Sequence, residues 1–468
     1  MGFNFKGCDR GQGFLMPPNI RDWIPEGDLV WFVIDAVEGM DLSSFYARYR
    51  PDGWGNAAYD PAMMVSLLIY AYCLGERSSR KIERLCERDI AFRLICANHV
   101  PDHATIARFR QNNEEGLEGL FCEVLRLCAE VGLLKVGLLA LDGTKIRARA
   151  SLDANRSHDY LREEVRRWLD EAEEADARED RLWGTDRRGD ELPPELRRSQ
   201  DRRRRIKECL ERLDREAREV ESKRREQLSE RKEEERRSGK KKRGRKPKSP
   251  EKARDDQEKK AKANITDPDS RIMKTRSGYL QGYNAQAVVT EDQVIVAAEL
   301  TPKENDVGQL HPMVEQAKEN LARVAVTEGI GAVVADAGYF SEDNLKGERG
   351  GKERGEGPEL YIAVIKDRKQ RAEPQEPEPE QAALPEDATE RQKMERKLRT
   401  EEGRAAYKKR GQMVEPVFGQ IKEGRGFNRF SRRGHPACRS EWRFVCAAHN
   451  LLKLWRYLAS TAPMASLR

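Results

Sequence analysis

Hydrophobic and polar positions change their spacing along the chain, and these changes divide it into regions. Residues 61–73 form one continuous apolar run, which predicts a buried helix with Asp60 as its N-cap. Residues 78–93 and 101–111 place apolar residues on one side and basic residues on the other, which is typical of amphipathic helices. We therefore predict a helical N-terminal domain over residues 1–130.

The middle of the chain contains short apolar runs that predict strands. Residues 138–141 and 332–335 are too short for helices, and each run ends at an aspartate, Asp142 or Asp336, with a glycine close behind. Strands are also expected over residues 278–290, 294–300 and 360–365, with helices over residues 306–325 and 342–345. This alternation predicts a mixed α/β domain built from residues 136–159 and 265–370.

Three other regions differ in composition. Residues 160–264 are dominated by charged residues and predict long charged helices, such as a hairpin, followed by a disordered basic stretch. Within it, residues 243–247 are similar to the minor-groove core of an AT-hook, although a solvated linker has the same composition. Residues 371–400 are expected to be an acidic, proline-rich linker, and residues 401–468 a group of C-terminal helices.

Charge changes the picture because it is unevenly distributed. The 468 residues include 88 Lys and Arg against 82 Asp and Glu, but the basic excess is concentrated in residues 240–248 and 422–443. Such clusters are typical of proteins that bind nucleic acid. No apolar run approaches the ~18 residues of a membrane span, so we expect no membrane association. The nine cysteines have no C-x-x-C spacing and are expected to be reduced core thiols.

One N-terminal segment has the pattern of a DNA reader. Residues 101–111 predict a turn and a helix that presents Thr105, Arg108 and Arg110, which would suit the second helix of a helix-turn-helix motif. An ordinary amphipathic helix with a solvated basic face has the same pattern.

A third acidic residue joins the two aspartates. Pro416 disfavours helical geometry at Glu415, so we expect a helix to begin there, with Tyr407, Arg410 and Lys422 in the same basic element. Aspartates followed by glycine are also ordinary turn residues. Together, however, three carboxylates suit two Mg²⁺ ions, or Mn²⁺, in phosphodiester cleavage, because hard cations prefer oxygen ligands.

With these motifs the chain resembles bacterial insertion-sequence transposases of the DDE class, in the group with a Y-R-E-K signature. Asp142, Asp336 and Glu415 match the three catalytic, metal-binding acids of that family. Tyr407, Arg410 and Lys422 match the accompanying signature, except that four residues separate Arg410 from Glu415 where the group has three. The similarity extends to residues 282–286 and to residues 301–306.

The resemblance implies an α+β fold with an RNase H-like catalytic domain, a helical N-terminal DNA-binding domain and a charged helical insertion at an unusual place. It implies metal-dependent hydrolysis at the terminal inverted repeats of an insertion sequence, then attack of the freed 3′-hydroxyl on target DNA. Arg410 and Lys422 would contact phosphates, and Tyr407 would position the DNA backbone. A cytoplasmic, nucleoid-associated homodimer would hold two double-stranded transposon ends in a synaptic complex.

Other functions remain compatible with the sequence. An RNase H-like nuclease without strand transfer would need the same acids. A transposase derivative that binds DNA without catalysis would keep the same domains. The charged region of residues 160–264 also allows a coiled-coil interaction protein, although its heptads are irregular.

Overall fold

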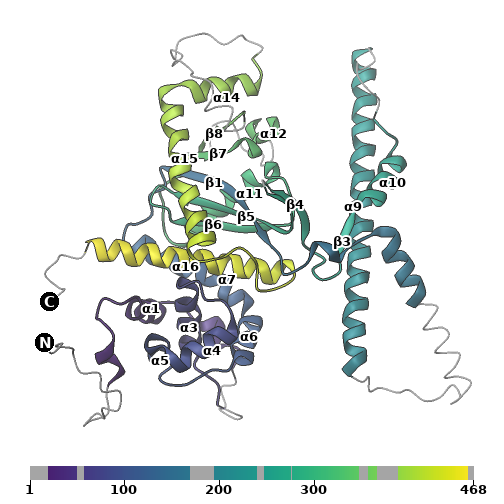
Figure 1. Cartoon of the computed structure of the whole chain (residues 1–468). Helices are drawn as coiled ribbons and strands as arrows, with labels where there is room; N and C mark the ends of the chain where they lie inside the picture. Colours follow the sequence, from purple (N-terminus) through teal and green to yellow (C-terminus); the bar gives the residue numbers. More distant parts are fainter. Residues whose placement is uncertain are drawn as a thin grey trace, which may run out of the picture.

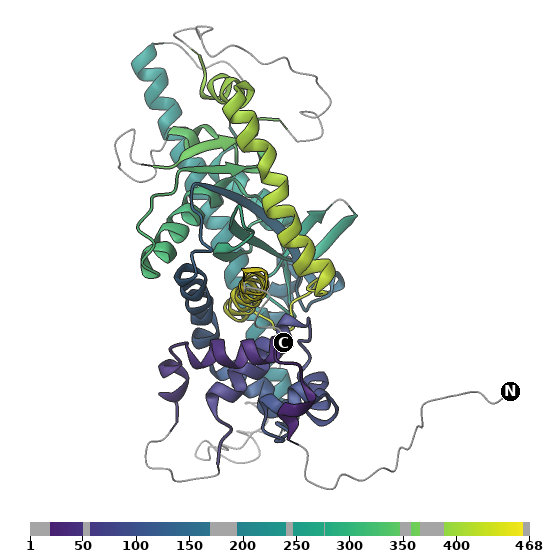
Figure 2. The same cartoon turned by 90° about the vertical axis from the view of Figure 1, so that its left-hand side faces the viewer.

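The computed structural model describes residues 19–49, 57–168, 194–239, 247–275, 277–346, 357–365 and 388–461. Its elements form three groups, a helical bundle near the N-terminus, a mixed sheet with its covering helices, and a helical arm (Figure 1). A long C-terminal helix, α16 (His435–Thr461), lies between the bundle and the sheet, as Figures 1 and 2 both show.

The N-terminal bundle is helical, as predicted. Asp60 caps α3 with its side chain on the backbone N–H of Ala62, and Pro61 occupies the first turn, where its missing N–H costs no hydrogen bond. Asp28 caps α1 in the same way. The bundle consists of η1 (Ile20–Trp23), α1 (Leu29–Glu38), α2 (Ser43–Tyr46), α3 (Pro61–Cys73), α4 (Ser79–Arg88), α5 (Ile90–Ile95), α6 (His103–Asn112) and α7 (Glu114–Glu130).

The main sheet is built around the long strand β5. Antiparallel partners of β5 are β1 on one side and β4 and β6 on the other, while β1, β7 and β8 run parallel to one another. The predicted hairpin of residues 278–300 is therefore present as β5 and β6. The bounds are β1 (Leu138–Arg147), β4 (Arg271–Thr275), β5 (Gly278–Thr290), β6 (Ile295–Thr301), β7 (Ala332–Ala335) and β8 (Glu359–Ile362).

The end of the first strand differs from the prediction. Asp142 was expected at the end of β1, but the strand continues to Arg147 because β5 keeps pairing with it as far as Gly282. The parallel partner β7 does end at Ala335, immediately before Asp336, as predicted.

Short elements and one helix connect the strands. The helix α11 (Leu310–Arg323) follows β6 and packs on β5 and β6. Shorter pieces are η3 (Val307–Gln309), η4 (Ala337–Tyr339) and α12 (Glu342–Lys346). The expected linker of residues 371–400 is in part helical, because α14 (Glu390–Arg399) begins with a capping box made by Thr389 and Gln392. Residues 371–387 of that linker lie outside the described residues.

The helix α15 (Glu401–Gly419) corrects a second prediction. Glu415 and Pro416 lie in its interior, not at its start, which is capped by Thr400. Pro416 cannot donate to the carbonyl of Gln412. That carbonyl instead accepts a hydrogen bond of 3.0 Å from the side chain of Gln293, so the helix continues through the proline. It packs along β1, β7 and β8 and leads into a π-helical turn, η5 (Gln420–Gly424).

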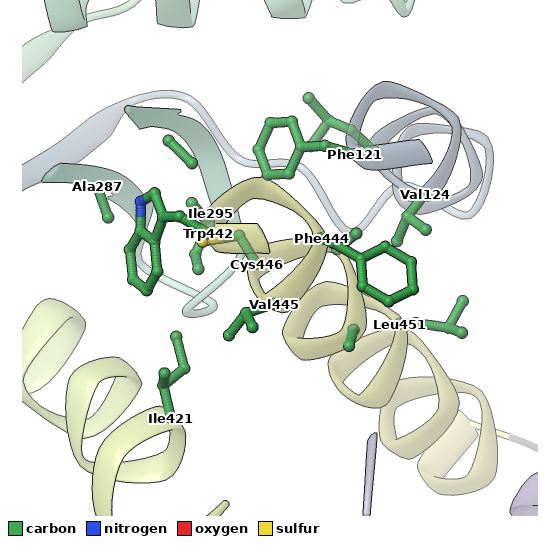
Figure 3. Packing of buried hydrophobic residues seen from close by; sticks show 14 of the residues in the cluster. Phe121, Val124, Ala287, Ile295, Ile421, Trp442, Phe444, Val445, Cys446 and Leu451 are labelled. Carbon is green, nitrogen blue, oxygen red and sulfur yellow. The ribbon is translucent and has the colours of Figure 1, made fainter. Parts of the chain in front are cut away.

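The core is continuous from the bundle through α16 to the sheet. Trp442 is fully buried and donates from Nε1 to the carbonyl of Gln286 on β5, while Phe444 lies near Phe121 and Val124 of α7 (Figure 3). One buried cluster includes residues of the bundle, of α16 and of the sheet. The helix α16 therefore joins the bundle and the sheet into one folding unit.

The arm comes from the charged region of residues 160–264, where long charged helices were predicted. Its helices are α9 (Pro194–Ser238) and α10 (Pro250–Lys260), and its small strands are β2 (Asn155–Ser157) and β3 (Lys262–Asn264). A second, smaller cluster holds its base, formed by Leu161, Ile206, Cys209, Leu213 and Ala263. Of the AT-hook-like segment, residues 243–246 lie outside the described residues. Among the described helices, none has the length and apolarity to cross a bilayer.

Candidate active site

Two of the predicted acids meet at neighbouring strands. Leu141 of β1 lies opposite Ala335 of β7 in parallel register, so Asp142 and Asp336, the next residue of each strand, lie side by side. Asp142 Oδ1 accepts a hydrogen bond of 2.7 Å from the N–H of Gly143. Asp336 caps η4, and its Oδ1 accepts a bond of 2.8 Å from the N–H of Gly338. Both carboxylates are therefore held by the backbone that follows them.

Arg410 is bound to Asp142. Its Nη1 lies 2.9 Å from Asp142 Oδ2, and the Arg410 side chain is only 6% exposed. The sequence predicted a contact between Arg410 and a DNA phosphate, but the structure places its charge on the partly buried carboxylate of Asp142. The guanidinium also lies over the ring of Tyr407, 5.7 Å from its centroid.

The environment of Asp142 favours its protonated form. The pKa of Asp142 is raised to about 7, chiefly by burial; the charge of Arg410 lowers it, and the charges of Asp336 and Asp306 contribute to the rise. Carboxylates that crowd together in this way are typical of sites that bind divalent cations, because the cation neutralises them.

Glu415 is on the neighbouring helix and faces solvent. A Cβ on Gly411, one turn earlier on α15, would lie 3.5 Å from Glu415 Oε1, so the carboxylate lies back along its own helix. The structure thus brings together Asp142 and Asp336 and leaves Glu415 at the exposed side of α15.

Lys422 reaches the same strand as Asp142. Its Nζ donates to Thr144 Oγ1 at 3.1 Å and to the carbonyl of Lys145 at 3.4 Å. Burial lowers the pKa of Lys422. The amine therefore lies two residues beyond Asp142, at a place where it can meet an anionic group near that carboxylate.

The two arginines predicted on α6 have different environments. Arg108 is exposed, as a DNA contact requires. Arg110 is buried, and its guanidinium donates to the carbonyl of Arg77 at 2.8 Å and to the hydroxyls of Tyr72 and Ser79. The prediction that Arg110 contacts DNA is therefore wrong for this structure, because its donors hold the start of α4.

A third aspartate, Asp306, lies near Asp142 and Asp336, and the sequence alone predicted no role for it. Asp306 follows β6, and its Oδ1 accepts hydrogen bonds from Asn284 Nδ2 at 2.6 Å and from Gln286 Nε2 at 2.8 Å. The signal for this contact was the Asn-x-Gln spacing on β5, because residues two apart on a strand share a face.

The donor set fits divalent metal ions. Carboxylate oxygens and amide oxygens are the ligands that Mg²⁺ and Mn²⁺ prefer. A separate group, His158 with Asp214 and Glu258, lies at the base of the arm, where Arg162 contacts both carboxylates at 3.5 and 3.6 Å. The positive charge of Arg162 therefore already neutralises these two carboxylates.

Two protein families match the chain. The family described as Transposase domain (DUF772) matches residues 18–112, which span most of the N-terminal bundle. The family described as Transposase DDE domain matches residues 369–455, a range that contains Glu415. No curated protein and no solved structure matches the chain. The two matches flank the strands that carry Asp142 and Asp336, and both support an insertion-sequence transposase of the DDE class, a metal-dependent enzyme that cleaves and transposes DNA.

Proposed function

We propose that this transposase binds the terminal inverted repeats of an insertion sequence, cleaves the DNA at those ends, and joins the freed 3′-hydroxyl to target DNA. Asp142, Asp336 and Glu415 hold two divalent cations, Mg²⁺ or Mn²⁺, in an RNase H-like domain. Two bound cations would lower the pKa of the attacking water and stabilise the leaving oxygen.

The observation that carries the proposal is the side-by-side placement of Asp142 and Asp336. They come from positions 194 residues apart in the sequence, yet the parallel register of β1 and β7 makes them neighbours. Glu415 lies on α15, the helix from which Arg410 reaches Asp142. The whole acidic set thus belongs to two adjacent strands and the helix that packs on them.

The sheet supports an RNase H-like domain. Strands β1, β5 and β6 form an antiparallel meander, β4 pairs with the start of β5, and β7 and β8 add in parallel on the other side of β1. The domain comprises residues 136–159 and 265–370, and the helix carrying the last acid comes from residues 401–468.

DNA contacts are assigned to Arg108, which is exposed, and to Lys422 and Tyr407, which are half-buried. Arg108 on α6 would help the bundle of residues 1–130 to read the transposon end, and Lys422 with Tyr407 would contact the scissile strand near Asp142. Arg410 keeps Asp142 in place. Two copies of the chain would synapse two ends on the DNA of the nucleoid.

The test is strand cleavage of a labelled duplex that carries the element's own terminus, with Mg²⁺ or Mn²⁺. Asp142→Ala, Asp336→Ala and Glu415→Ala should each reduce cleavage at least 1,000-fold, of the order lost when a catalytic group is removed, while DNA binding persists. Asp343→Ala is the matched control, because Asp343 is an exposed acid seven residues beyond Asp336.

The products separate the remaining functions. Joined products with a second duplex support transposition, whereas cleavage without joining would indicate a nuclease. A parent protein that binds the terminus but cuts with neither cation would contradict catalysis. Normal cutting by Glu415→Ala would remove Glu415 from the site and leave the two aspartates.

A further inference from the structure

Asp306 is held in one orientation by the strand beside it. Asn284 and Gln286 stand on one face of β5, and both amides donate to Asp306 Oδ1. Gln286 is itself fixed, because its Oε1 accepts a hydrogen bond from the buried hydroxyl of Tyr339. This network uses one oxygen of Asp306 and leaves Oδ2 directed elsewhere.

The second oxygen faces Asp336. A Cβ on Gly338 would lie 3.0 Å from Asp336 Oδ1 and 3.2 Å from Asp306 Oδ2, so the two carboxylates flank one small gap that the glycine leaves open. A Cβ on Gly143, the residue after Asp142, would lie 3.0 Å from Asp306 Oδ1. Glycines therefore clear the space around Asp306 at both catalytic strands.

An unpaired oxygen lies beside Gly143, on the side of Asp306 Oδ1. Asn284 is only 1% exposed, and its Oδ1 has no hydrogen-bond partner among the described residues. The same virtual Cβ on Gly143 lies 2.9 Å from this oxygen. A buried acceptor without a partner is unfavourable, and a cation ligated there would remove that cost.

Helix capping does not explain the orientation of the Asp306 carboxylate. Asp306 precedes η3, yet within residues 301–325 its carboxylate makes no capping bond to that turn. Electrostatics agree with the geometry, since the charges of Asp306, Asp142 and Asp336 all add to burial in raising the pKa of Tyr339. The charges of all three carboxylates thus act on the buried hydroxyl of Tyr339.

We propose that Asp306 is a further metal-binding carboxylate of this transposase, which shares a divalent cation with Asp336 through Oδ2 while Asn284 Oδ1 supplies a neutral ligand oxygen. The inference rests on the proposed metal site and deepens it. The N-x-Q pair on β5 is then the support that aims Asp306 at the cation.

The experiment measures binding of Mn²⁺ to the full chain without turnover, by calorimetry and by the electron paramagnetic resonance of free Mn²⁺. Asp306→Asn keeps the shape of the side chain and the acceptor for both amides but removes the charge. It should weaken Mn²⁺ binding at least tenfold, as Asp336→Asn does, while Asp343→Asn binds like the parent. Melting in EDTA checks that each variant is folded.

Different outcomes separate this inference from the proposal on which it rests. Parent-like Mn²⁺ binding by folded Asp306→Asn, with loss in Asp336→Asn, would overturn the role of Asp306 and keep the catalytic pair. Absence of Mn²⁺ binding in the parent, with or without terminal DNA, would overturn both.

A second measurement needs no variant. Fe²⁺ bound in place of Mn²⁺, treated with ascorbate and peroxide, cuts the backbone close to its ligands. We expect cuts near residues 142, 306 and 338 in the parent chain, which excess Mg²⁺ suppresses. Cuts near residues 142 and 338 that spare residues 303–308 would exclude Asp306 as a ligand.

Discussion

At the scale of single residues, burial decides which basic side chains can meet DNA. Arg110 and Arg410 both belong to helices with basic faces, but each is buried and directs its guanidinium at protein groups. Arg108 and Lys408, on the same two helices, are exposed. A substitution therefore tests a different property at each position, folding stability for the buried arginines and DNA affinity for the exposed ones.

Arg410→Gln should lower the free energy of unfolding by about 3 kcal/mol, because it leaves the carboxylate of Asp142 buried without its partner. Adding Asp142→Asn should recover most of this loss. Lys408→Gln, an exposed neighbour, should change stability by less than about 0.5 kcal/mol. Urea titrations of the four proteins measure these differences.

The same variants test the predicted phosphate contact of Arg410. We expect the salt dependence of DNA binding to be unchanged in Arg410→Gln, because its charge is already neutralised within the protein. If Arg410→Gln leaves stability unchanged but reduces the slope of log affinity for DNA against log salt concentration by about one, Arg410 contacts a DNA phosphate after all.

His449 should make the fold sensitive to acid. It is fully buried, and burial together with Arg425, whose Nη2 lies 3.0 Å from Nδ1, lowers the pKa of His449 to about 3. Between pH 6.5 and 3 the unfolded chain binds a proton that the folded chain excludes, so stability falls as the pH falls through this range. The loss from this histidine between pH 7.5 and 5 should be about 2 kcal/mol.

The measurement is chemical unfolding of the parent and of His449→Gln from pH 7.5 to pH 5. The variant should show a flatter dependence, whereas His99→Gln, in which the lost histidine is exposed, should follow the parent. Identical slopes in parent and His449→Gln would exclude His449 as the origin of acid sensitivity.

At the scale of elements, the junction between α14 and α15 determines where α15 crosses the sheet. Thr400 donates to the carbonyl of Lys397 at 2.7 Å and caps α15 through the N–H of Gly403. A Cβ on Gly403 would lie 2.0 Å from the carbonyl oxygen of Lys397, so only glycine fits between the two helices. The angle at this junction sets the position of Arg410 and Glu415.

Gly403→Ala should cost about 1–3 kcal/mol, because the new methyl group forces backbone apart at the junction. Gly419→Ala, in the last turn of the same helix and in open space, should stabilise the chain by up to about 1 kcal/mol. Thermal melts compare the two. If Gly403→Ala leaves the melting temperature unchanged, α14 can shift to make room for the methyl group without disturbing α15.

Elements with local signals were predictable, and elements that depend on distant partners were not. The cap at Asp60 and the end of β7 before Asp336 are determined by residues adjacent in sequence. The continuation of α15 through Pro416 depends on Gln293, which is far away in sequence. In the site, the two aspartates were predictable from strand ends, but the partner of Arg410 and the position of Asp306 follow from tertiary packing.

At the scale of the whole molecule, α16 joins the bundle and the sheet. Arg443 on this helix contacts Glu118 of α7 and also Glu299 of β6, whose Oε2 lies 2.9 Å from Nη2. Because the same helix also carries the shared hydrophobic core, the bundle and the sheet should unfold together. The arm has its own small core and should open separately.

Hydrogen exchange of the full chain tests this division. Amides of α3, α7, β5 and α16 should share the slowest exchange, limited by global unfolding, while those of α9 and α10 exchange through a cheaper opening. Arg443→Ala should speed exchange in the bundle and the sheet alike. Much faster exchange in α3 and α7 than in β5 would show that the bundle is an independent unit.

The long arm has a mechanical consequence. The 45 residues of α9 form a rod of about 68 Å, which is supported by α10 and by the small cluster at one part of its length. Successive Arg–Glu pairs along it, such as Arg225 with Glu221 and Arg237 with Glu233, stiffen the rod in water. A small rotation at the two-stranded base would therefore move the far end of α9 by a much larger distance, because the helix between them is stiff.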